Sequence, residues 1–478
     1  MRMAVKALSL TAAGVLLGSL SGCGSDGDSG TKGASGSGGA AGAALTSKIT
    51  APAAFDTAKG WEIKADWLPQ GQPLPYAVSP GRDAVGYLDR TAQGYVLNVR
   101  DASSGTALST STPWKGPQLS EKQSRQPSSE LAVPQIALVA SGQREYFAVW
   151  ALGQARKDEL HESKEVVSVA FYPVDASGKG VAPAAEGTAE APDGDFDRPS
   201  VFAGPGGLLV TTYGHDSILV APDGKVTPRG SEEVTLNGEA ADPDYLESFP
   251  GPSGLVTNGE DGGTGMGGFG AERGWQSTKV APAGADPLLR YDSVVNGVRT
   301  EPNGRIVGAA GNHLIANWTP KGAGAGTGAS DGLSAIHDMA TGAVQATAAC
   351  AAAGTEYDAD VPNPKSLAEV QPAVSPDGHY LVKGGSVYDL RTGKGSCPDA
   401  GDDAKKITLR TVGDDGTAYG LAGDSKAMTP VAVSAKTGSA EPLPEMTSVP
   451  DALTKGAGVF VTYAGTDTMR LVVLDLRG

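Results

Sequence analysis

The chain has 478 residues, with 38 Lys and Arg against 54 Asp and Glu, so its formal net charge at pH 7 is −16. This balance argues against a protein that holds nucleic acid or an anionic membrane surface through a basic face. Glycine (68) and proline (32) are abundant and 40% of the residues are hydrophobic, which predicts many turns and short strands around a sizeable core.

The first 22 residues have the pattern of an export signal. Arg2 and Lys6 supply a positively charged start, and residues 7–20 are mostly apolar or small. The apolar run is too short to span a bilayer and no twin-arginine pair precedes it, so it predicts a signal peptide for the general export route. No later stretch is long and apolar enough to cross a membrane.

Leu20, Ser21, Gly22 and Cys23 follow directly after the apolar run. These residues resemble the lipobox of bacterial lipoproteins. The resemblance implies cleavage after residue 22, acylation of Cys23 with diacylglycerol and a fatty acid such as palmitate, and an anchor in membrane lipid on the extracytoplasmic face. The small residues at 21 and 22 leave room for a peptidase, and a thiol is the nucleophile that accepts the lipid. The alternative is a chance cysteine after an ordinary signal peptide.

Residues 24–44 are almost entirely Gly, Ser, Ala and Asp, which is typical of a flexible linker. The expected organisation is a signal peptide at 1–22, a lipidated cysteine with its tether at 23–46, and one folded domain at 47–478. A tether of this length has a root-mean-square reach of roughly 25 Å.

Acylation of Cys23 leaves Cys350 and Cys397 as an even pair in an oxidising compartment. A disulfide between them would close a loop of about 47 residues, worth about 4 kcal/mol in the chain-entropy model. The alternative is two separate buried thiols.

A short pattern recurs along the body: a β-rich run, an aspartate, and a turn that contains Thr-Gly, Ser-Gly or Asp-Gly. The pattern occurs at Asp101, Asp175, Asp223, Asp338 and Asp389, and at Thr437–Gly438 with Ser434 in place of the aspartate. A carboxylate at this place accepts hydrogen bonds from N–H groups of the turn. The pattern therefore predicts repeated strands with structural turns between them.

The clearest repeat, residues 373–393, contains three strands separated by Ser-Pro-Asp-Gly and Gly-Gly turns and ends on Asp-Leu-Arg-Thr-Gly. Four antiparallel strands in about 40 residues make one blade of a β-propeller. The body resembles bacterial β-propellers with PD40, WD40-like or quinoprotein-like repeats. The Trp-Asp pairs of WD40 repeats are missing, and so is the Trp that closes quinoprotein repeats, so no cofactor is implied.

We therefore predict an all-β fold, a single β-propeller of about seven four-stranded blades, with six to eight admissible. The expected blade centres are near residues 90, 160, 210, 260, 320, 385 and 425. The strand Arg470–Leu476 is predicted to complete a blade begun at the N-terminus and so to close the ring. Trp150 and Trp318 end apolar strands and are predicted to lie in the core. A tandem of β-sandwiches is the alternative architecture.

Two motif matches lack the structural context that their chemistry needs. Residues 263–268 fit G-x-G-x-x-G, but no helix pattern or acidic ribose ligand follows. Ser330 fits the nucleophile elbow G-x-S-x-G, but it has no strand before it and no helix after it. Both are interpreted as loops.

Metal and histidine chemistry is weakly represented. Asp193, Asp195 and Asp197 alternate as in a calcium loop, but Arg and Gly stand where such a loop needs Gly and Glu, so calcium and a solvated acidic turn both stay open. No two of the five histidines have zinc-helix spacing. His337 and His379 are interpreted as structural, and His215 is the one candidate for a ligand or catalytic role.

The leading hypothesis is a lipid-anchored extracytoplasmic β-propeller that acts as a binding module or envelope scaffold. It predicts no catalytic residue, no cofactor and no metal, and a partner that is an envelope protein or glycan rather than nucleic acid. The alternative is an enzyme of a propeller class, either a quinoprotein-like dehydrogenase or a carbohydrate-active hydrolase or lyase, with charged groups that converge on the mouth of the central channel.

Overall fold

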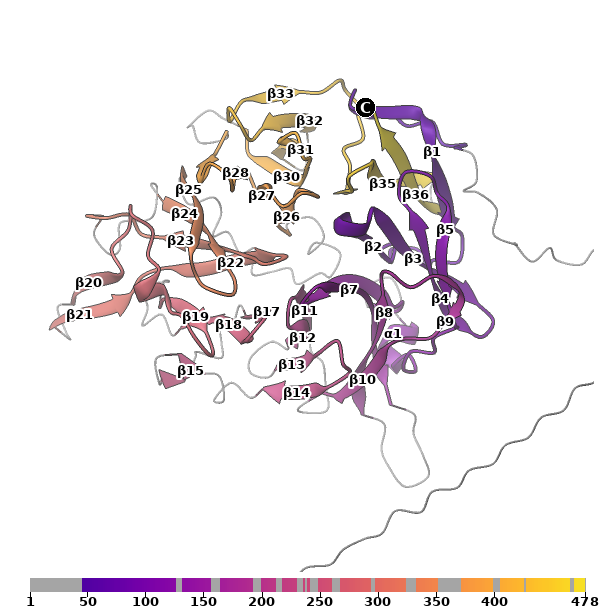
Figure 1. The fold of residues 1–478 in the computed structure, drawn as a ribbon, viewed down its shortest axis with the longest axis horizontal. Helices are drawn as coiled ribbons and strands as arrows, with labels where there is room; N and C mark the ends of the chain where they lie inside the picture. Colours follow the sequence, from indigo (N-terminus) through magenta and orange to yellow (C-terminus); the bar gives the residue numbers. More distant parts are fainter. Residues whose placement is uncertain are drawn as a thin grey trace, which may run out of the picture. The chain divides into compact units, whose positions relative to one another are not determined.

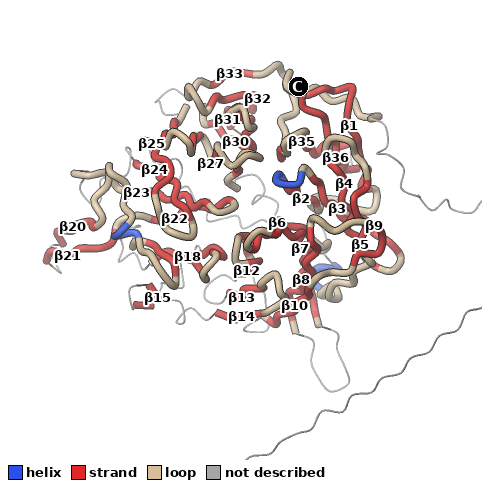
Figure 2. The backbone as a smooth tube through the Cα atoms, viewed as in Figure 1, coloured by secondary structure: helices blue, strands red, loops and turns tan. Residues whose placement is uncertain are grey.

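The computed structural model describes residues 45–477 with internal gaps, which are 126–130, 156–163, 192–198, 212–216, 230–234, 237–238, 241–247, 260–266, 294–296, 324–331, 351–370, 399–404, 425–426 and 465–467. Residues Ala40–Gly478 form one compact unit. Strands and turns make up almost all of its described part (Figure 2). Helical turns are confined to three short segments among these residues: η1 (Pro80–Arg82), α1 (Glu121–Arg125) and η4 (Ser277–Lys279). No helix there is long and apolar enough to cross a membrane.

The strands fall into successive antiparallel meanders, which are the blades of the propeller (Figure 1). Blade 1 contains β2 (Tyr76–Ser79), β3 (Ala84–Thr91), β4 (Gly94–Asp101) and β5 (Ala107–Ser111). Blade 2 contains β6 (Gln135–Ser141), β7 (Arg144–Gln154), β8 (Glu165–Pro173) and β10 (Ala185–Glu190). Blade 3 contains β11 (Ser200–Gly204), β12 (Gly207–Thr211), β13 (Ser217–Val220) and β14 (Val226–Arg229), and blade 4 contains β17 (Ser248–Gly251), β18 (Gly254–Asn258) and β19 (Phe269–Ala271).

The second half of the chain continues in the same way. Blade 5 contains β22 (Arg305–Ala310), β23 (His313–Trp318), β24 (Gly332–Asp338) and β25 (Val344–Cys350), and blade 6 contains β26 (Ala373–Val374), β27 (Tyr380–Lys383), β28 (Ser386–Asp389) and β29 (Lys394–Ser396). Blade 7 contains β30 (Ile407–Val412), β31 (Thr417–Asp424), β32 (Ala427–Ser434) and β33 (Ala440–Pro442). Blade 8 contains β34 (Ala452–Leu453), β35 (Ala457–Ala464), β36 (Thr468–Leu476) and the N-terminal strand β1 (Phe55–Ala65).

A few strands lie outside the meander pattern. The strand β9 (Gly178–Val181) leaves blade 2 and pairs in parallel with β5 of blade 1. Two hairpins stand between blades, β15 (Thr235–Leu236) with β16 (Glu239–Ala240), and β20 (Leu288–Ser293) with β21 (Gly297–Pro302). The strand β9 extends the sheet of blade 1, whereas each hairpin is a two-stranded sheet of its own, and the order of the blades is not interrupted.

The two ends of the chain meet in blade 8. The strand β1 pairs antiparallel with β36, in a register that runs from Phe55 opposite Leu476 to Ala65 opposite Met469. The N-terminal strand therefore supplies the outer strand of the blade that the C-terminal strands begin. This pairing confirms the prediction for residues 470–476, and it leaves no open edge where the first blade meets the last.

Alternate side chains of the central strands contact different neighbouring blades. In β12, Leu208 and Val210 pack against blade 2, whereas Leu209 packs with Leu255 of blade 4. In β35, Val459 contacts blade 1. A strand projects successive side chains to opposite faces, so each sheet is covered by another sheet on both faces. Two-layer β-sandwiches would leave one face of each sheet exposed, so the alternative architecture is wrong.

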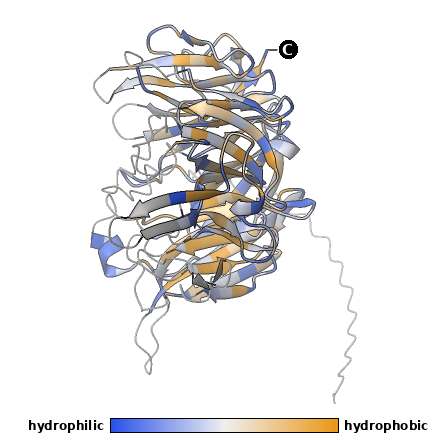
Figure 3. Ribbon diagram, turned by 90° about the vertical axis from the view of Figure 1, so that its left-hand side faces the viewer, coloured by the Kyte–Doolittle hydropathy of each residue, from blue (hydrophilic) through white to orange (hydrophobic). Residues whose placement is uncertain are grey.

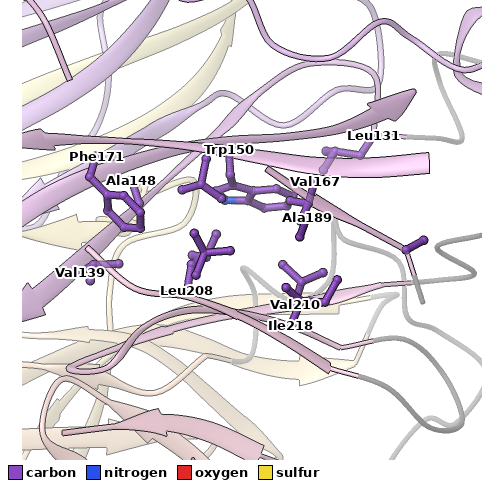
Figure 4. Packing of buried hydrophobic residues seen from close by; sticks show 13 residues of the cluster. Leu131, Val139, Ala148, Trp150, Val167, Phe171, Ala189, Leu208, Val210 and Ile218 are labelled. Carbon is purple, nitrogen blue, oxygen red and sulfur yellow. The ribbon is translucent and has the colours of Figure 1, made fainter. Parts of the chain in front are cut away.

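Each boundary between neighbouring blades, from blades 1 and 2 round to blades 8 and 1, is filled by one hydrophobic cluster. The cluster between blades 2 and 3 contains Trp150, Phe171, Leu208 and Ile218 (Figure 4). Figure 3 shows hydrophobic segments along many of the strands. Because the clusters lie between blades, the blades depend on one another for their burial.

Two tryptophans, which the sequence analysis did not identify, dock across blade boundaries. The indole Nε1 of Trp61 in β1 donates a 2.8 Å hydrogen bond to the carbonyl of Ala102 in blade 1, and that of Trp275 donates a 3.2 Å bond to the carbonyl of Met339 in blade 5. Each ring lies against the glycine of the following Asp-x-x-(Ser/Thr)-Gly turn, Gly105 or Gly342. A Cβ at either glycine would overlap the ring, so only glycine fits.

The seven expected blade centres all fall within the spans of blades 1–7, and blade 8 is the one assembled from both termini. The count of about seven is therefore not confirmed: the described strands form seven four-stranded blades and one three-stranded blade, which lies at the upper limit of the admissible range. Trp150 and Trp318 are 8% and 1% exposed, which confirms that both belong to the core.

Candidate functional site

The turns after the first and third strands of each blade lie at the same end of the sheet, because these strands run in the same direction. We call this the aspartate end, after the aspartates that its turns carry, among them Asp83, Asp101, Asp338, Asp377, Asp389 and Asp414. Three of them bind only their own turn. Oδ1 of Asp101 accepts from the Ser104 N–H (2.7 Å), Oδ1 of Asp338 from the Thr341 N–H (2.8 Å) and Oδ1 of Asp389 from the Arg391 N–H (2.9 Å). The structural role predicted for these carboxylates is confirmed.

Asp377 and Asp414 instead link two blades. The backbone N–H of Asp377, in the first turn of blade 6, donates a 2.8 Å hydrogen bond to Oδ1 of Asp414 in the first turn of blade 7. Asp377 also accepts from the Ser375 hydroxyl (2.6 Å), and its Oδ2 lies 2.6 Å from Nδ1 of His379. Two carboxylates and one imidazole therefore meet at the boundary between blades 6 and 7.

The two carboxyls of this pair titrate in opposite directions. Partial burial works to raise the pKa of Asp377, but the hydrogen bonds from Ser375 and His379 and the nearby imidazole charge lower that pKa overall. Burial raises the pKa of Asp414, and the neighbouring Asp377 charge raises it further against the opposing charge of Lys455. Like charges at close range cannot both ionise freely, so Asp414 is the carboxyl that retains a proton more readily.

The same end carries a second link, between blades 8 and 1. Oδ1 of Asp83 accepts a 3.0 Å hydrogen bond from the N–H of Gly456, and its Oδ2 accepts a 3.0 Å bond from the Ser103 hydroxyl. Asp83 has a left-handed backbone, with φ of 48°, which side chains other than glycine adopt rarely. Carboxylates thus link the first turns of blades 6 and 7 and, separately, those of blades 8 and 1.

A second charged cluster lies on, or directly before, the first strands of blades 7, 8 and 1. Nη1 of Arg410 is 3.1 Å from Oδ1 of Asp451, and Oδ2 of Asp451 accepts a 2.7 Å hydrogen bond from the Val461 N–H. Burial raises the pKa of the nearby Tyr76, and the charge of Asp451 adds to this effect. The enzyme hypothesis requires charged groups that converge on the mouth of the central channel, whereas Arg410 and Asp451 pair with each other as an ion pair.

The structure joins Cys350, at the end of β25, to Cys397, directly after β29, by a disulfide with a Cα–Cα distance of 5.8 Å. The bond connects the outer strands of blades 5 and 6, which also touch through the parallel pair Thr347 and Lys394. The two separate thiols that the sequence left open are not present.

A small open cavity of about 260 Å³ lies close to the disulfide, on the sheet of blade 7. Its wall is mostly apolar and includes Pro398, Lys405, Ile407, Ala422, Val431 and Pro442. Its volume is below that of most small-molecule sites. It has no contact with the carboxylates of the aspartate end.

His337 is a structural residue, as predicted. It is fully buried, its Nε2 accepts from the Trp318 indole (3.2 Å), and its Nδ1 donates to the carbonyl of Gly342 (2.8 Å). Burial lowers its pKa to about 4, against the opposing effect of the Gly342 carbonyl. Both ring nitrogens of His337 are therefore used in structural hydrogen bonds.

Several of the predicted site residues lie outside the described residues. These are Cys23, Asp193, Asp195, Asp197, His215, Ser330 and most of the 263–268 motif. Lipidation, calcium binding and a role for His215 therefore stay predictions. Among the described residues, no group of three or more His, Cys, Asp or Glu side chains is placed to hold a metal ion.

No protein-family model and no curated protein matches the chain. Solved structures of low similarity do match. A structure described as the Dos1 propeller has a TM-score of 0.35 and 11% identity, over 87% of this chain and 94% of that one. The CNH domain of AfRom2 has a TM-score of 0.29 and 11% identity, over 87% of this chain and 100% of that one. TolB from Acinetobacter baumannii has a TM-score of 0.24 and 10% identity, over 84% of this chain and 65% of that one. The propeller assignment depends on the strand pairing and boundary clusters of this chain itself.

Proposed function

We propose that the protein is a lipid-anchored β-propeller on the extracytoplasmic face of a cell membrane, where it acts as a binding module or envelope scaffold. The observation that carries the proposal is the combination of the Leu20–Cys23 sequence with a ring closed through β1 and β36. The chain enters the closed ring from Cys23 through the N-terminal strand β1, which suits a protein held at a membrane by one lipidated residue. The Cys350–Cys397 disulfide supports an oxidising compartment.

The binding role is supported by the chemistry of the aspartate end. Its carboxylates are engaged in turns and in links between blades, so they hold the loops in place. Rigid loops on a propeller are suited to recognise a partner surface. The expected partner is an envelope protein or a glycan.

The anchor is tested with the full chain expressed in a bacterial host. We expect the wild-type protein in the membrane pellet and the Cys23→Ala variant in the soluble fraction, with Ser21→Ala as a matched control that keeps the small residue and the cysteine. Mass spectrometry of the N-terminal peptide should show a diacylglycerol and a fatty acid on Cys23. A Cys23→Ala variant that stays in the pellet would contradict the anchor.

The binding role is tested by native mass spectrometry of the protein extracted gently from its own envelope. Co-purification of a protein or glycan in fixed stoichiometry is the expected result. A recurrent added mass of cofactor size would instead favour the dehydrogenase, hydrolase or lyase hypothesis.

A further inference from the structure

Three exposed hydrophobic side chains stand out at the end of the blades opposite to the aspartates. Met428, Met446 and Tyr463 are 57%, 85% and 68% exposed, and the other exposed large hydrophobic side chains of the described residues are at most 49% exposed. Single exposed apolar residues need no explanation, but a group at one place marks an interaction surface.

Strand register places the three residues at the same end of neighbouring blades. Met428 pairs with Gly423 close to the β31–β32 turn of blade 7, and Tyr463 pairs with Met469 close to the β35–β36 turn of blade 8. Met446 lies in the connection 443–451 between these blades. This connection leaves blade 7 where Leu443 donates to the Pro430 carbonyl (2.8 Å), and it enters blade 8 from the side of Tyr463.

The N-terminal segment reaches the body at this same end. Nη1 of Arg470 donates to the hydroxyls of Thr46 (3.0 Å) and Ser47 (2.9 Å), and Arg470 pairs with Thr462, the neighbour of Tyr463. Glu62 completes the contact by accepting from the Ser47 N–H at 3.0 Å. The 22 residues from Cys23 to residue 44 therefore join the body beside the exposed side chains.

We propose that this end of blades 7 and 8 rests on the lipid surface, with Met428, Met446 and Tyr463 in the headgroup region. The proposal depends on the proposed anchor at Cys23. A tether of this length keeps the body at a root-mean-square distance of roughly 25 Å from its lipid, so even a weak contact is strongly populated. Methionine is flexible and apolar, and tyrosine combines an apolar ring with a hydroxyl, which suits a membrane interface.

The consequence is a fixed orientation. The aspartate end, with the Asp377–Asp414 and Asp83 links, faces away from the bilayer, where a partner reaches it. Glu445, beside Met446, and Lys48, beside Ser47, are both exposed.

The test uses the full acylated protein in vesicles of phosphatidylethanolamine and phosphatidylglycerol. In the mature chain Cys23 carries lipid and Cys350–Cys397 is a disulfide, so an introduced cysteine is the single free thiol. A polarity-sensitive fluorophore is attached to Met446→Cys, to Tyr463→Cys, and to the control Lys436→Cys, which is exposed in the last turn of blade 7 at the aspartate end. Lipids with a nitroxide on the headgroup or upper acyl chain serve as quenchers.

We expect loss of fluorescence at positions 446 and 463, and no loss at position 436. If the protein floats with the vesicles but all three positions are quenched equally, or none is quenched, the proposed orientation is wrong. A protein that does not float and shows no lipid mass on Cys23 overturns the anchor, and the orientation with it. Flotation and N-terminal mass thus separate the two failures.

Discussion

Trp275 docks on the last turn of blade 5, so one methyl group added at Gly342 in that turn should lower the free energy of unfolding by an unusually large amount. A Cβ at Gly342 would lie 2.4 Å from Cδ2 and 2.6 Å from Cε3 of the Trp275 ring, and the residue has φ of +73°. The indole also donates its hydrogen bond to the Met339 carbonyl in that turn. The Gly342→Ala substitution therefore strains the backbone and displaces the ring at the same time.

The two effects can be separated by a matched variant. Gly311, in the first turn of the same blade, has φ of +54° and no atom within 4 Å of its Cβ position. A left-handed alanine costs about 1 kcal/mol, which is the whole expected loss in free energy of unfolding for Gly311→Ala. Overpacking adds about 1–3 kcal/mol, so Gly342→Ala is expected to lose about 2–4 kcal/mol.

Urea unfolding followed by circular dichroism measures both losses, and tryptophan emission reports whether an indole becomes exposed. We expect Gly342→Ala to lower the urea concentration at the unfolding midpoint much more than Gly311→Ala does. We also expect it to shift the tryptophan emission of the native state to the red. Equal losses for the two variants, with unchanged emission, would refute the docking of Trp275 against this turn.

Three further predictions concern the disulfide and two titrating sites. Replacing Cys350 and Cys397 by alanine, or reducing them, removes a link between residues 47 apart and should cost about 4 kcal/mol in the free energy of unfolding by urea; an unchanged midpoint would contradict the bond. The pKa of Asp414 is raised above 3.8, so the native state binds its proton more tightly and loses stability as the pH rises through the folded pKa. The Asp414→Asn variant keeps an amide oxygen that accepts from the Asp377 N–H. Its free energy of unfolding should therefore exceed that of the wild type at pH 7 and differ little from it below pH 3.8. The same difference between variant and wild type at both pH values would count against the carboxyl pair. Folding lowers the pKa of His337 from 6.5 to about 4, so the unfolded state takes up the proton first as the pH falls. The free energy of unfolding should therefore decline as the pH drops through that range. At pH 5.5, ¹⁵N NMR should show a neutral ring with the proton on Nδ1, and a charged ring there would overturn the assignment.

The sequence by itself determined the local turn chemistry and, through it, the class of fold. Asp338 binds the N–H of Thr341 three residues later, and Asp101 and Asp389 act in the same way, so each turn is encoded within a few residues. Repetition of these turns between short strands predicted the blades. The strand at residues 470–476 was predicted to complete a blade begun at the N-terminus and so to close the ring, and β36 does pair with β1.

Only the tertiary structure decided which turns meet. Trp61 binds Ala102 across 41 residues, and Asp377 binds Asp414 across 37. The sequence contained both tryptophan and aspartate residues, but nothing local distinguishes a docking Trp61 from a core Trp318, or a linking Asp414 from a capping Asp389. These contacts exist because the closed ring brings the turns of each blade against those of the next blade. Only that geometry determines which carboxyl binds within its own turn and which one connects two blades.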